Sequence, residues 1–91
     1  MEVCFYATLE PLVGQRRVEV PLPAGATLRD LVDKLAEGWP GLREHLFEED
    51  GALSRRVNIF LGGRNVRWLR GLDTPVGEGE SVDIFPPVAG G

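Results

Sequence analysis

The sequence predicts an α+β fold in which one main helix lies across one face of a mixed sheet of four to five strands. Period-two alternation of apolar and polar residues occurs near both ends of the chain, and one strongly amphipathic helical pattern lies between them. Glycine, proline and acidic clusters separate these elements. We expect a single domain over residues 1–91, because a chain of 91 residues buries one modest core.

The first two elements are predicted strands. Residues 1–9 alternate, and the apolar side carries Val3, Phe5, Ala7 and Leu9. A loop is expected over residues 11–14, which contain proline and glycine. A second alternating run follows over residues 17–22. The two runs predict a hairpin.

The main helix is predicted after the turn at residues 23–26. Its apolar positions recur at i, i+3, i+4, i+7 and i+8, namely at Leu28, Leu31, Val32, Leu35 and Ala36. Thr27 and Asp30 have the spacing of a capping box, with Asp in place of the usual Glu or Gln. Gly38 is expected to close the helix as a left-handed cap, and Trp39 with Pro40 blocks its continuation.

The second half of the chain predicts a short helical turn and three more strands. The turn is expected over residues 42–47, and the strands over residues 56–61, 65–68 and 81–85. Two hairpins that flank one helix can share a mixed sheet if the first and last strands lie side by side. This arrangement is the β-grasp, although periodicity alone leaves the strand order open.

The C-terminal end, residues 86–91, is predicted to be an extended, flexible and reactive tail. Pro86 and Pro87 favour an extended segment that holds the end of the chain away from the domain. Gly90 and Gly91 lack a Cβ and therefore form a slender terminus that can enter a narrow site in a partner. The alternative is an ordinary frayed end.

Composition excludes several other classes. A net charge of −4 with a pI near 4.9 disfavours a nucleic-acid partner. No stretch approaches the roughly 18 apolar residues of a membrane span, and no signal segment precedes the first strand, so we expect a cytoplasmic protein that does not bind membranes. One cysteine and one histidine cannot build a structural zinc site.

The segment GEGESVDIFPPVAGG, residues 77–91, resembles the C-terminus of the small subunit of molybdopterin synthase. With the element order above, the chain resembles the MoaD/ThiS family of ubiquitin-like sulfur carriers. The segments VNIF at 57–60, VRW at 66–68 and GLDTP at 71–75 are also similar to the carrier for cysteine synthesis and to archaeal small ubiquitin-like modifiers. The resemblance implies the ubiquitin-like β-grasp and supplies the strand order.

The resemblance also implies a mechanism and its residues. In this family an ATP-dependent activating enzyme adenylates the terminal glycine, here Gly91, and sulfur then replaces AMP to leave a thiocarboxylate. Gly90 would let the tail pass a constriction. The partner-binding residues would be Phe85, Pro86, Pro87 and Val88. The carrier itself is a co-substrate and not an enzyme, and it binds no cofactor because ATP is bound by its partner.

Four functions are therefore weighed. The first is the sulfur-carrying small subunit of molybdopterin synthase, which would dock to the large subunit. The second is a carrier that supplies sulfur for cysteine or another thio-metabolite, and the third is a modifier that joins Gly91 to lysines by isopeptide bonds. The fourth, an interaction module without tail chemistry, fits the tail least well.

The remaining conspicuous residues have structural explanations. Cys4 in a strand is expected to be a small buried hydrophobe, and His45 a solvated surface residue. We interpret Trp39 and Phe60 as parts of the core rather than anchors for a partner, and Trp68 as an aromatic that could serve either purpose. Arg64, Arg67 and Arg70 form a basic cluster, which either pairs with an acidic partner or is a solvated strand edge.

Overall fold

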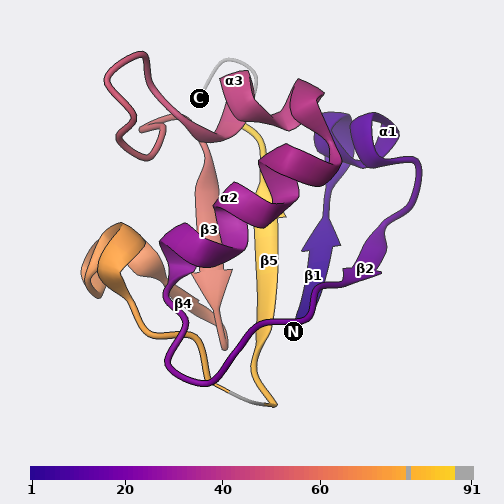
Figure 1. Ribbon diagram of the computed structural model, residues 1–91. Coiled ribbons are helices and arrows are strands. Elements are labelled where there is room, and N and C mark those ends of the chain that lie inside the picture. The colour runs from indigo at the N-terminus through magenta and orange to yellow at the C-terminus, as the bar shows by residue number, and fades with distance from the viewer. Residues whose placement is uncertain (78, 88–91) are drawn as a thin grey trace.

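The computed structural model describes residues 1–77 and 79–87 and shows a five-stranded mixed sheet with one long helix across one face (Figure 1). The strand order is β2-β1-β5-β3-β4. The strands are β1 (Glu2–Phe5), β2 (Arg17–Glu19), β3 (Asn58–Leu61), β4 (Arg64–Asn65) and β5 (Ser81–Phe85). The predicted β-grasp arrangement is confirmed.

The last strand lies at the centre of the sheet. β5 pairs in parallel with β1, where Val3 is opposite Val82, and antiparallel with β3, where Ile59 is opposite Ile84. β1 and β2 form the expected antiparallel hairpin. The end of the chain is therefore anchored by backbone hydrogen bonds on both sides before it leaves the sheet.

The helix α2 (Leu28–Gly38) covers the sheet, and its start is as predicted. The backbone N–H of Thr27 donates to Asp30 Oδ2 at 2.9 Å, which is the reciprocal bond of a capping box. The expected left-handed cap at Gly38 is wrong. Gly38 is the last helical residue, and the chain leaves the helix at Trp39 with φ −132°, because Pro40 follows and disfavours a helical conformation there.

The core lies between α2 and the sheet. Leu31 and Leu35 of the helix and Phe5, Ile59 and Ile84 of the strands are fully buried. Burial of side chains of this size contributes roughly 1.5–3 kcal/mol each. The predicted helical turn is present as η2 (Pro40–Leu42) followed by α3 (Arg43–Leu46), and it covers one end of this core.

The structure differs from the prediction at the end of the first strand and in two later segments. The strand predicted over residues 1–9 ends at Phe5, and Ala7, expected in that strand, is exposed with φ 51° at the start of a 3-10 helix. The expected loop at residues 11–14 is mostly helical, because η1 (Ala7–Leu9) runs directly into α1 (Glu10–Val13). Pro11 occupies the first turn of α1, where its missing N–H costs nothing, and Gly14 ends the helix at φ 88°. A proline and a glycine three residues apart can therefore bracket a helical turn as well as a loop.

The predicted strand at residues 65–68 is also wrong beyond its first residue. β4 ends at Asn65, and η3 (Val66–Trp68) follows, with η4 (Gly71–Asp73) after it. The side chain of Asn65 accepts a hydrogen bond from the backbone N–H of Arg67 at 3.0 Å. This local bond turns the chain out of the strand, as Asn side chains commonly do.

None of the helices within residues 1–77 and 79–87 has both the length and the apolar character that a membrane crossing needs.

Candidate functional site

The candidate site begins on the open face of the sheet, at the end of β5. Successive residues of a strand point to opposite faces, so Val82 and Ile84 are buried under α2 while Asp83 and Phe85 face away from the helix. Phe85 is half-buried rather than enclosed. It is the last residue of the strand and directly precedes Pro86.

Phe85 is the middle member of an aromatic cluster that consists of Tyr6, Phe60 and Phe85. The rings of Tyr6 and Phe85 are stacked with centroids 4.3 Å apart and an interplanar angle of 10°. Phe60 meets Phe85 edge to face at 5.6 Å. Since all three side chains are half-buried on the open face, the interpretation of Phe60 as a core residue is wrong.

A hydrogen bond fixes the cluster on one side. The hydroxyl of Tyr6 donates to Asp83 Oδ1 at 2.8 Å. This bond, with smaller effects of burial and of the carboxylate charge, raises the pKa of the Tyr6 phenol above its ordinary value. The guanidinium of Arg16 lies 5.9 Å from the centroid of the same ring. Tyr6 therefore holds a fixed position against Phe85 and remains a neutral phenol at physiological pH.

Only part of the predicted site is described by the structure. Pro86 is half-buried and Pro87 is exposed, so the two prolines lead the chain outward from the sheet. The other predicted site residues, Val88, Gly90 and Gly91, lie outside the described residues. The roles assigned to Phe85, Pro86 and Pro87 stay predictions, but the structure places these three residues together at one end of the central strand.

Tyr6 and Asp83 were not predicted as members of this site. The alternation of residues 1–9 places Tyr6 on the same face as Cys4, and that of residues 81–85 places Asp83 on the same face as Phe85. The expected strand order places the first and last strands side by side, and the missing information was their register, in which Cys4 is opposite Asp83. The alternation of side chains along each strand, combined with this register, identifies the residues of the cluster.

The other conspicuous residues are divided between structure and surface. Trp39 packs against the core as predicted, and Cys4 is buried and His45 is exposed, also as predicted. Trp68 is 83% exposed.

The basic cluster is not a uniformly solvated edge. All three arginines are exposed, but the guanidinium of Arg67 donates to the backbone carbonyls of Ser54, Arg55 and Val57. Arg67 thereby holds the segment that leads into β3. Among residues 1–77 and 79–87, no group of three or more His, Cys, Asp or Glu side chains is arranged to hold a metal ion.

Comparison with known proteins gives a consistent picture. The ThiS family profile matches residues 3–91. Small archaeal modifier protein 3 of Haloferax volcanii is 37% identical over 91 residues, covering 100% of this chain and 98% of the relative. Sulfur carrier protein CysO of Mycobacterium tuberculosis is 38% identical over 80 residues, covering 86% and 83%. The molybdopterin synthase sulfur carrier subunit of Escherichia coli is 32% identical over 93 aligned residues, covering 100% and 99%.

Solved structures agree with the fold. The crystal structure of SAMP1 from Haloferax volcanii superposes with a TM-score of 0.87 at 31% identity, over 99% of this chain and 97% of that one. The ubiquitin-like β-grasp that the sequence predicts is thereby confirmed at the level of the whole fold.

Proposed function

The chain belongs to the ThiS family of sulfur carriers and small ubiquitin-like modifiers, and on that premise we propose that it carries sulfur as a thiocarboxylate on Gly91. An ATP-dependent activating enzyme adenylates the carboxyl group, and sulfur then displaces AMP. The carrier contributes a tail of suitable reach and a docking surface, while nucleotide binding and catalysis belong to the partner. We place these reactions in the cytoplasm.

The observation that carries this proposal is the position of the aromatic cluster. Tyr6, Phe60 and Phe85 form an apolar surface at the point where β5 ends and Pro86 begins. Aromatic side chains commonly anchor protein interfaces, and a partner that binds these rings also receives the tail in a fixed direction. β5 is paired on both sides, so this direction is set by the sheet.

Two classes of acceptor for the sulfur compete. The ending Phe-Pro-Pro-Val-x-Gly-Gly favours the molybdopterin branch, in which the chain would be the small subunit of the synthase. The similarity to CysO favours delivery to cysteine or another thio-metabolite. Affinity capture of the thiocarboxylated chain separates them, because a synthase large subunit and a cysteine synthase are different proteins.

A second function, protein modification, is favoured by the 37% identity to a small archaeal modifier over the full chain. It uses the same activated carboxyl group of Gly91 but transfers it to lysine amines of target proteins. A ladder of amide-linked conjugates that survives denaturation and thiols distinguishes this function from sulfur transfer.

Intact-mass measurement after co-expression with the activating enzyme tests the proposal. We expect the mass change that accompanies replacement of one oxygen by sulfur. Deletion of Gly91 should abolish this change without altering thermal stability, because a terminal residue beyond the sheet contributes little buried area. A chain whose mass never changes would refute the carrier function, and a large fall in melting temperature on deletion would show that the terminus is structural.

A further inference from the structure

The chain offers very few amines to an activated carboxyl group. Lys34 is its only lysine, and the remaining basic residues are arginines. A guanidinium stays protonated in proteins, so an arginine does not serve as an acyl acceptor. The ε-nitrogen of Lys34 is thus the only side-chain amine of the chain that can form an amide.

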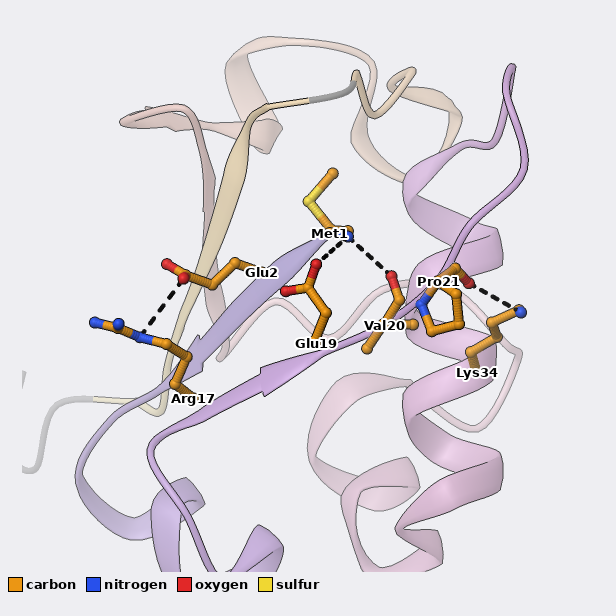
Figure 2. Close-up of polar contacts among 7 residues, drawn as sticks. All are labelled: Met1, Glu2, Arg17, Glu19, Val20, Pro21 and Lys34. Carbon is orange, nitrogen blue, oxygen red and sulfur yellow. Dashed lines mark hydrogen bonds and ion pairs between the residues drawn. The ribbon is translucent and has the colours of Figure 1, made fainter.

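Lys34 is accessible and held by a neutral group. It lies on the outer side of α2, and its Nζ donates to the backbone carbonyl of Pro21 at 3.1 Å (Figure 2). No carboxylate of residues 1–77 and 79–87 lies within ion-pair distance of this nitrogen. A single exposed hydrogen bond to a carbonyl exchanges readily with water, so the nitrogen can leave Pro21 and attack an acyl carbon.

The α-amine of Met1 is more enclosed. It donates to Glu19 Oε1 at 3.2 Å and to the carbonyl of Val20 at 3.0 Å (Figure 2). The Met1 side chain is 4% exposed, and the amine lies against the end of β2, the strand that pairs with β1. Acylation there would disturb two hydrogen bonds, of which the one to Glu19 is also an ion pair, whereas acylation of Lys34 disturbs one hydrogen bond.

The layers of the fold separate Lys34 from the proposed docking surface, which is the aromatic cluster of Tyr6, Phe60 and Phe85. The buried residues of α2 face the sheet and Lys34 faces away from it, while the aromatic cluster occupies the opposite face of the sheet. A protein attached at Lys34 therefore leaves Tyr6, Phe60 and Phe85 uncovered. The modified copy keeps its own docking surface.

We propose that Lys34 is a modification site at which one copy of this chain is joined to the C-terminus of another. The inference rests on the activated carboxyl group of the proposed function. ATP first converts the Gly91 carboxylate of the donor copy into an acyl-adenylate with release of pyrophosphate. The ε-ammonium of Lys34 loses a proton to water, its lone pair attacks the acyl carbon, the bond to AMP breaks, and an amide forms.

One acceptor per chain determines the product. Each copy has a single lysine and a single C-terminus, so repeated transfer gives unbranched polymers in which every linkage is the same. Growth can continue because the docking surface stays free after Lys34 is acylated.

The test uses the purified full chain, the activating enzyme of its source organism and ATP. We expect a denaturation-resistant species with the mass of two chains less one water. Trypsin should release from it a branched peptide in which residues 71–91 are attached to residues 30–43 through Lys34. The variant Lys34→Arg, which keeps the positive charge and a donor for Pro21, should lose this species entirely while its melting temperature and its thiocarboxylation remain unchanged.

The outcomes separate this inference from the proposed function. Absence of thiocarboxylation in the wild-type chain would sink the proposed function and the inference together. Normal thiocarboxylation without a joined species would overturn only the inference. A joined species that persists in Lys34→Arg, or whose branch is at Met1, would also overturn it, because another nucleophile would then be the acceptor.

Discussion

Replacing Phe85 with alanine tests whether this side chain serves mainly in partner binding or mainly in the stability of the fold. The ring is half-buried, stacked on Tyr6 at 4.3 Å and in edge contact with Phe60 at 5.6 Å. Aromatic pairs of this kind contribute about 0.5–1.5 kcal/mol each beyond the buried area. Truncation on an open face leaves no closed cavity, so we expect Phe85→Ala to lower the free energy of unfolding by about 2 kcal/mol, below the 3–5 kcal/mol typical of core phenylalanines.

The same change should affect binding strongly. A central aromatic anchor contributes at least about 2 kcal/mol to an interface, which corresponds to roughly a 30-fold loss of affinity. Domains of this size are stable by about 5–15 kcal/mol, so the variant remains folded during the measurement. The binding assay is titration with the activating enzyme, and stability comes from urea unfolding with the linear extrapolation.

Phe5→Ala is the matched control. Phe5 is 0% exposed and faces α2, so its loss should cost about 3–5 kcal/mol of stability. Binding by the fraction that remains folded should be unchanged, since the side chain does not reach the open face. The reasoning fails if Phe85→Ala destabilises the protein as much as Phe5→Ala and leaves the affinity for the activating enzyme intact.

Three further changes test separate contacts. The hydrogen bond that raises the pKa of Tyr6 favours the neutral phenol in the folded state, so its contribution to stability is present below about pH 10 and lost as the pH rises through the raised pKa. The melting temperature of wild type should exceed that of Tyr6→Phe at neutral pH, and a gap that persists at high pH would contradict this. Gly14→Ala should lower the free energy of unfolding in urea by about 1 kcal/mol, because residue 14 has a φ of 88°. The control Gly41→Ala, whose added Cβ meets open space, should leave this free energy unchanged. Equal effects of the two changes would refute the argument from strain. Arg67→Ala should lower stability by about 1–2 kcal/mol and speed hydrogen exchange in residues 52–57, while Arg64→Ala, on the exposed edge, should change stability by less than about 0.5 kcal/mol.

The sequence predicted most of the fold because its periodic signals are strong. α2 carries five apolar residues at helical spacing, and all five are buried as predicted. Local signals also located β1, β3 and β5 to within a few residues. These elements bury one face, and burial of one face is what periodicity records.

The errors occurred where a single local bond or conformation decides the outcome. Asn65 ends β4 through a bond to the Arg67 N–H, and Gly14 closes a helical turn that reads as a loop. At the candidate site, Phe85 was identified from the tail, but its contact with Tyr6 depends on the pairing of the first strand with the last. The Tyr6–Asp83 bond joins residues 77 positions apart. Alternation assigns a face to each residue and leaves the neighbouring strand unspecified.

The central position of β5 has a mechanical consequence for the tail. A last strand at the edge of a sheet has one ladder of hydrogen bonds and can be peeled away when a partner pulls on the terminus. β5 has two ladders, one to β1 and one to β3, and its side chains Val82 and Ile84 are 0% exposed under α2. Pulling β5 out would break both ladders and open the core, which amounts to global unfolding. Under the proposed function, a partner that pulls on the tail would therefore pull against both ladders, and the sheet holds the chain as far as Phe85.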